Sequence, residues 1–250
     1  MTKIGIIGGS GMDDPELVKD YHEENPDTKY GKPSAPIVCG KIQGVDVCIL
    51  ARHGRKHEIP PTQVNYRANI AALKILGCTH ILATSAVGSL QEKVIPGDIV
   101  FPSQFLDFTK HRATTFYDRV GEVEHISMAE PFSYYLRGLL MQTAEELGYK
   151  KHNLGTIVVI EGPRFSTRSE SFMFKKLGAD IIGMTTVPEV TLAREAEMEY
   201  ASITMVTDYD CWKKDEAPVT FEMVLQRMKD NAEQVKNLIL RTIPKIADKE

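Results

Sequence analysis

Short apolar runs alternate with amphipathic helical patterns along most of this chain, and that alternation limits the fold more than any other feature. Strand-like runs rich in β-branched residues are expected at 3–8, 45–51, 80–83, 98–101, 156–160, 180–182 and 201–206. Three helical patterns end in Leu-Gly, at Leu76-Gly77, Leu147-Gly148 and Leu177-Gly178, where glycine supplies the left-handed residue that closes a helix. Strands that alternate with helices predict an α/β fold.

No linker, internal repeat or low-complexity tract divides the 250 residues, so a single domain is expected over residues 1–250. From Phe221 onward, apolar residues recur three or four positions apart, which predicts a long amphipathic C-terminal helix. Residues 107–130 show no such period. They are expected to form an excursion loop, a kind of segment that often carries function.

Composition argues against several classes of protein. The wholly apolar runs are far shorter than the ~20 residues that cross a bilayer, and the N-terminus lacks a secretory signal, so a cytoplasmic protein without a membrane partner is expected. The 30 basic residues are scattered among 34 acidic ones, which predicts no nucleic-acid partner. Cys39, Cys48, Cys78 and Cys211 form no C-x-x-C pair and are expected to be buried free thiols. No metal site is indicated.

Loops rich in glycine and hydroxyl groups follow several of the expected strands. The first, Gly8-Gly9-Ser10-Gly11, fails the dinucleotide fingerprint because Asp14 stands where glycine is required, and no P-loop motif is present. Arg52 and His53 follow the second expected strand, and Ser85 follows the third. Each loop alone is more often a structural turn. Because strand ends in an α/β sheet meet at one edge, their convergence favours a phosphate site.

The last expected strand ends in two carboxylates, Asp208 and Asp210, which would share one face of an extended segment. Crowded carboxylates have pKa values that are pushed apart, so that one can stay protonated and donate while the other accepts. The plain alternative is a turn with two aspartates. Phe165 and Met184 follow two earlier strands and would add apolar groups to the same edge.

Together these segments resemble the trimeric purine nucleoside phosphorylases. The resemblance is carried by Ile7-Gly8-Gly9-Ser10-Gly11, Ala51-Arg52-His53-Gly54, Ser85-Ala86-Val87-Gly88-Ser89, Glu161-Gly162-Pro163-Arg164-Phe165, Met184-Thr185-Thr186-Val187-Pro188-Glu189 and Thr207-Asp208-Tyr209-Asp210-Cys211-Trp212. It implies a phosphorylase-type α/β fold, with a mixed, partly barrel-like sheet flanked by helices. It also implies a homotrimer with sites near the subunit interfaces, and no cofactor, since inorganic phosphate is a co-substrate.

The resemblance also implies a role for each site residue. The implied phosphate ligands are Ser10, Arg52, His53, Ser85, Ala86 through its backbone N–H, and Thr185. The implied nucleoside contacts are Met184 at the ribose, Phe165 at the base, His125 from a neighbouring subunit, and Phe221, Val224 and Leu225 around the 5′ group. Asp208 would protonate N7 of the purine, and Asp210 would hold its 6-amino group. Ser10 and Ser85 replace the Thr of many relatives, but either hydroxyl can donate to phosphate.

The implied reaction is a pentosyl transfer: phosphorolysis of S-methyl-5′-thioadenosine to adenine and 5-methylthioribose 1-phosphate, with phosphate as the nucleophile. Carboxylate acceptors suit a 6-amino group better than a 6-oxo group, and an apolar 5′ pocket favours methylthio over hydroxyl. Three alternatives stay open. They are a phosphorylase that acts on adenosine, inosine, guanosine or methylthioinosine, a nucleosidase that uses water, and a noncatalytic nucleoside-binding protein.

Overall fold

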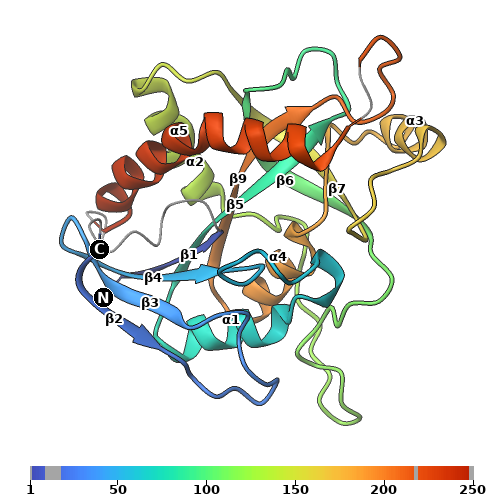
Figure 1. Ribbon diagram of the computed structural model, residues 1–250. Helices are drawn as coiled ribbons and strands as arrows, with labels where there is room; N and C mark the ends of the chain where they lie inside the picture. Colours follow the sequence, from blue (N-terminus) through green and yellow to red (C-terminus); the bar gives the residue numbers. More distant parts are fainter. Residues whose placement is uncertain (1, 9–17, 217–218, 248–250) are drawn as a thin grey trace.

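A nine-stranded mixed sheet organises the chain in the computed structural model, which describes residues 2–8, 18–216 and 219–247 (Figure 1). The strands are β1 (Lys3–Gly8), β2 (Lys19–Glu24), β3 (Ile37–Ile42), β4 (Val45–Ala51), β5 (His80–Ser89), β6 (Ile99–Phe108), β7 (Lys151–Ile160), β8 (Ile181–Gly183) and β9 (Glu199–Asp208). Their order is β2-β3-β4-β1-β5-β8-β7-β6-β9, and a further pairing of β5 with β9 closes the second half into a ring. The expected mixed, partly barrel-like sheet is confirmed.

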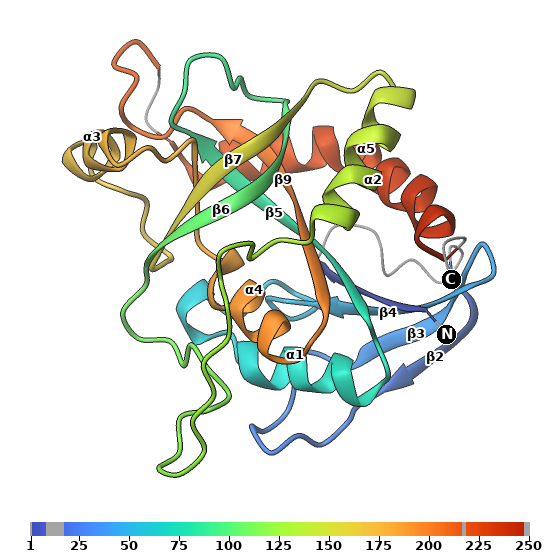
Figure 2. The ribbon, with the colours of Figure 1, turned by 180° about the vertical axis from the view of Figure 1, so that it is seen from behind.

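Helices cover the sheet on two sides (Figures 1 and 2). They are α1 (Tyr66–Ile75), α2 (Tyr134–Glu146), α3 (Arg168–Lys176), α4 (Thr186–Glu195) and α5 (Phe221–Ala247). Helices α2 and α5 pack against each other on one side, and α1 and α4 do so on the other. The glycines Gly77, Gly148 and Gly178 follow α1, α2 and α3 with φ of +83°, +69° and +87°, as the Leu-Gly pattern predicts. In the described ranges, no helix is both long and apolar enough to cross a membrane.

Strand β1 shows why its sequence is apolar on both faces. It lies between β4 and β5, parallel to both. Ile4 and Ile6 pack with Leu238 of α5, whereas Ile7 packs on the other face with Leu73 of α1. All three isoleucines are wholly buried. A parallel strand that is covered on both faces has no need for polar alternation, and its carboxyl end is held rigidly at the edge of the sheet.

Strand β5 continues to Ser89, beyond the end expected at Ala83, so Ser85 and Ala86 lie within a strand and not in a loop. The reason is the parallel pairing of β5 with β9, which provides backbone partners along this stretch. The pairing has a bulge: Val87 faces Val206, but Gly88 faces Asp208, so Thr207 is an extra residue on β9.

Two strands were not expected from the sequence. Strand β2 lies at one edge of the sheet, and five of its six side chains are exposed, so it lacks an apolar pattern. Strand β3 forms a hairpin with β4 through Gln43 and Gly44, both with positive φ. Such a two-residue turn fixes the register of the strands that it joins.

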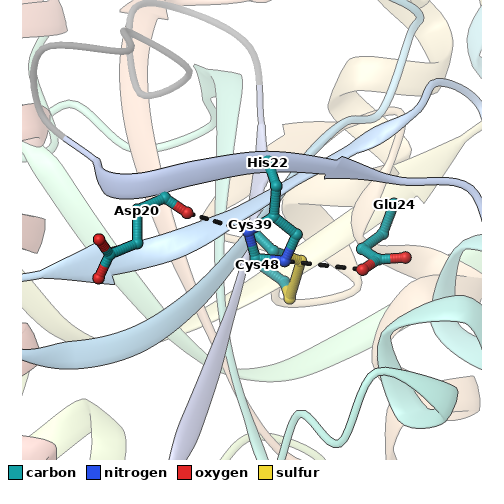
Figure 3. The surroundings of a disulfide bond; sticks show 5 residues. All are labelled: Asp20, His22, Glu24, Cys39 and Cys48. Carbon is teal, nitrogen blue, oxygen red and sulfur yellow. Dashed lines mark hydrogen bonds and ion pairs between the residues drawn. A yellow bond between two sulfur atoms is a disulfide. The ribbon is translucent and has the colours of Figure 1, made fainter.

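This register corrects the prediction that all four cysteines are free. Cys39 and Cys48 face each other across the β3–β4 hairpin, with their Cα atoms 4.3 Å apart, and form a disulfide. His22 of β2 pairs with Cys39 in the sheet, and its ring is held by the backbone carbonyl of Asp20 and faces Glu24 (Figure 3). The expectation was wrong for this pair because β3 was not recognised as a strand. Cys78 and Cys211 are free thiols.

Candidate active site

A cavity of about 520 Å³ lies at the carboxyl ends of several strands, where an α/β sheet binds its ligands. Most of the predicted site residues line it, namely Arg52, His53, Ser85, Ala86, Phe165, Met184, Thr185, Asp208, Asp210, Phe221, Val224 and Leu225. Ser10 lies outside the described residues. His125 does not line this cavity. The structure therefore brings twelve separately predicted positions to one place, although their individual roles stay predictions.

Hydroxyl and guanidinium groups gather at one end of the cavity. The Oγ of Ser85 lies 3.1 Å from the Oγ1 of Thr185, which directly precedes α4. The guanidinium of Arg52 forms a buried ion pair with Glu189 of α4, with Nε 2.7 Å from Oε2. Glu189 was not among the predicted site residues, since 137 positions separate it from Arg52. The strand-end motifs predict that these donors form an anion-binding end of the cavity.

His53 is neutral at this end of the cavity at physiological pH. Its Nδ1 lies 2.8 Å from the carbonyl oxygen of Ile59, which can only accept, so Nδ1 carries the hydrogen. Burial, with the positive charge of Arg52, lowers the pKa of His53 to about 4. The ring of His57 is tilted by 32° against that of His53, with centroids 4.5 Å apart, and its centroid lies 6.3 Å from that of the Phe221 ring. A row of rings therefore connects His53 to Phe221, the first residue of α5.

The lowered pKa of His53 predicts a pH-dependent stability. Below pH 6.5 the unfolded chain binds a proton that the folded chain refuses until about pH 4, so the free energy of unfolding falls as the pH falls through this window. The loss attributable to His53 is expected to reach up to about 3 kcal/mol. Urea unfolding of the wild type and of His53→Gln measures this loss. The amount by which the free energy of unfolding of the wild type exceeds that of the variant should shrink as the pH falls toward 4.

The exposed His22 provides the control. The difference in free energy of unfolding between the wild type and His22→Gln should not change over this pH range. Parallel stability curves for the wild type and His53→Gln between these pH values would contradict the neutral, buried imidazole.

The carboxyl of Asp208, the last residue of β9, lines the same cavity. Its Oδ2 accepts a hydrogen bond from Thr207 Oγ1, and its Oδ1 accepts one from the backbone N–H of Asp210, both at 2.7 Å. Burial raises the pKa of Asp208, with a further contribution from the charge of Asp210, although the two hydrogen bonds oppose the change. A carboxyl with a raised pKa is suited to hold and deliver a proton.

Asp210 reaches the cavity by a different route from the one expected. Its φ is +50°, so the segment turns after β9, and the two carboxylates do not simply share one face of an extended strand. Asparagine and aspartate tolerate this left-handed backbone better than most residues. The Oγ of Ser166 lies 2.6 Å from both carboxyl oxygens of Asp210. Ser166, which also lines the cavity, was missed because its neighbour Phe165 carried the stronger motif.

The first turns of α5 provide an apolar wall. Phe221, Val224, Leu225 and Met228 recur three or four residues apart and all line the cavity. Phe221 and Leu225 are 51% and 36% exposed, as side chains that face an open cavity should be. This face can cover an apolar group of a ligand.

A long loop after β6 projects from the sheet (Figure 2). Glu161 anchors its start by accepting hydrogen bonds from the backbone N–H groups of Lys110 and His111. Burial alone would raise the pKa of Glu161, but hydrogen bonds from Thr62 and these N–H groups lower it to about 2. His125, farther along the loop, is exposed and lies outside this cavity.

The partly closed sheet and the polar cavity at its strand ends define a phosphorylase, and the chain belongs to the phosphorylase superfamily, whose model matches residues 3–244. It is 55% identical over 249 residues to the S-methyl-5′-thioadenosine phosphorylase of Danio rerio, across 98% of this chain and 89% of that protein. The fold matches a methylthioadenosine phosphorylase from Schistosoma mansoni in complex with adenine, with a TM-score of 0.94 and 46% identity over 100% of this chain and 93% of that one. A mutant of the Schistosoma enzyme in complex with methylthioadenosine gives 0.93 and 45%, with the same coverage.

Proposed function

We propose that this protein is an S-methyl-5′-thioadenosine phosphorylase, which transfers the 5-methylthioribosyl group from adenine to inorganic phosphate. The single observation that carries the proposal is one cavity that joins anion-binding donors, a buried carboxyl pair and the apolar start of α5. The named relatives at 45–55% identity support the same substrate. An Asp210 carboxylate that accepts from a 6-amino group argues against inosine-type substrates.

The proposed chemistry divides between two sets of side chains that line the cavity. The bond between C1′ and N9 breaks as positive charge develops on the sugar, and phosphate, held by Arg52, Ser85 and Thr185, forms the new bond to C1′. The electron pair of the broken bond stays on the purine. The Asp208 carboxyl delivers a proton to N7, which neutralises that charge, while Asp210 accepts from the 6-amino group. No cofactor takes part in this scheme.

Product analysis with and without phosphate tests the proposed reaction. The protein is incubated with methylthioadenosine, and adenine and 5-methylthioribose 1-phosphate are measured. We expect equal amounts of both products with phosphate and no adenine without it. Adenine release in the absence of phosphate would identify a nucleosidase, and saturable binding without turnover would identify a binding protein. Faster turnover of methylthioinosine than of methylthioadenosine would instead favour a 6-oxopurine enzyme.

We further propose that the enzyme acts as a homotrimer in which His125 completes a neighbouring subunit's site. Support comes from the loop that carries His125, where the side chains of Val120 and Val123 are exposed among the residues that the structure describes. The cytoplasmic location expected from the sequence is part of this proposal, and cell fractionation tests it.

The shared site makes a prediction about mixed subunits. His125→Ala and Asp208→Asn are each expected to be inactive as pure proteins, because every site lacks one group. Subunits mixed after reversible dissociation should regain activity, since a site can combine Asp208 of one chain with His125 of another. Light scattering checks assembly in the same samples. A fully active monomer, or a mixture that stays inactive although subunits exchange, would contradict the shared site.

A further inference from the structure

The buried ion pair behind the cavity carries an inference about how phosphate is held. A guanidinium group has five N–H donors. In Arg52, Nε donates to Oε2 of Glu189 at 2.7 Å, Nη2 donates to Oε1 of Glu189 at 2.8 Å, and Nη1 donates to the carbonyl of Thr84 at 2.8 Å. One N–H group remains on each terminal nitrogen, and Arg52 lines the cavity. The guanidinium is thus fixed at three points and keeps two donors.

Glu189 is itself held from the protein core. Its side chain is wholly buried and does not line the cavity. Besides the two bonds from Arg52, it accepts a hydrogen bond of 2.7 Å from the hydroxyl of Tyr200, a wholly buried residue of β9. Tyr200 therefore fixes the carboxylate, and the carboxylate fixes the guanidinium.

The same contact changes the charge at the anion-binding end. Among the described residues that line the cavity, Arg52 is the one lysine or arginine, and Glu189 cancels its positive charge. His53 adds no charge at neutral pH. An anion in this place would be held by donors of fixed direction, with little net attraction from charge.

We propose that Glu189, supported by Tyr200, is a positioning residue for the phosphate co-substrate. It aims the two remaining N–H groups of Arg52 into the cavity and cancels the charge that would otherwise bind phosphate without orienting it. A nucleophile that keeps its own negative charge is also more reactive than one paired with a free cation. The inference rests on the proposed function, because it requires that the bound anion is the attacking phosphate.

Glu189→Gln separates orientation from charge. The substitution leaves Arg52 with an uncancelled positive charge, so charge alone would tighten phosphate binding. Loss of the paired hydrogen bonds between Arg52 and residue 189 would instead weaken phosphate binding. The NH2 group of Gln is a donor and cannot accept from the second guanidinium N–H. We expect kcat/KM for phosphate to fall by about tenfold or more, while KM for methylthioadenosine changes by less than about twofold. Calorimetry with inorganic phosphate should show the same loss of affinity.

Two further variants keep the test decisive. Tyr200→Phe retains the ion pair and removes only the hydroxyl that holds Glu189. We therefore expect phosphate KM to change in the same direction but less, by about two- to fivefold. Asp98→Asn is the matched control, because Asp98 is a buried carboxylate bonded to His152 and Ile95, outside the cavity. It should leave the phosphate KM unchanged.

Unchanged or tighter phosphate binding in Glu189→Gln, or equal losses for both co-substrates, would overturn the proposal. If Glu189→Gln does not fold, Tyr200→Phe decides, and a wild-type phosphate KM in that variant would overturn it. Failure of the proposed function is distinct: the wild type would then release no methylthioribose phosphate, although calorimetry would still measure phosphate affinity in every variant.

Discussion

Replacing Asp208 with Asn is expected to reduce adenine release by about 10²–10⁴-fold, the usual effect of losing a positioned general acid. The asparagine fits the site, since its carbonyl can accept from the N–H of Asp210 and its amide can donate to the hydroxyl of Thr207. It cannot pass a proton to the purine. The measurement is kcat/KM on methylthioadenosine at saturating phosphate, with folding checked by circular dichroism.

Asp210→Asn is the matched control for this loss. Its backbone has positive φ, which asparagine tolerates, and its amide can still bond to Ser166. We expect a smaller loss of rate and a higher ratio of methylthioinosine to methylthioadenosine turnover, because the amide can donate to a 6-oxo group. If both variants keep wild-type rates and the wild-type ratio of methylthioinosine to methylthioadenosine turnover, Asp208 and Asp210 have only a structural role in the turn.

Arg52→Ala should abolish efficient use of phosphate. Two hydrogen bonds to a charged ligand disappear, and at about 1.5 kcal/mol each they correspond to a loss of roughly 100-fold in kcat/KM for phosphate. The substitution also strands the buried carboxylate of Glu189, which is expected to lower the free energy of unfolding by about 3–5 kcal/mol. Steady-state kinetics and urea unfolding report the two effects separately.

A double variant distinguishes these two losses. Arg52→Ala/Glu189→Gln removes the stranded charge, so part of the lost stability should return while phosphate use stays low. If stability and phosphate use recover together, the kinetic defect of Arg52→Ala came from misfolding, and Arg52 would not be a phosphate ligand.

Much of the cavity could be predicted because its residues follow local signals. Helix-closing glycines and polar groups directly after apolar strands are visible within a few positions of sequence, and they placed Arg52, Met184 and Asp208 at one edge of the sheet. The apolar period predicted the helix α5, but not that its start lines the cavity, because contact with the core and contact with a ligand produce the same period. The family resemblance indicated this role.

What escaped prediction depends on contacts between distant segments. Glu189 ends a motif that follows a predicted strand, but no role was predicted for it, because its pairing with Arg52 exists only after folding. The bond between Cys39 and Cys48 required a hairpin register, and the strand that sets it was not recognised. The length of β5 was underestimated because glycine and hydroxyl residues suggested a loop, whereas pairing with β9 keeps the backbone extended.

The bulge opposite Gly88 has a consequence for how such a site arises. In a regular strand, Thr207 and Asp208 would point to opposite faces, yet here their side chains are hydrogen-bonded to each other and both line the cavity. One inserted residue therefore decides which side of the sheet receives the acidic group. Removing this one extra residue would turn the side chain at the end of β9 to the other face of the sheet, so the length of this strand end matters as much as the identity of its last residue.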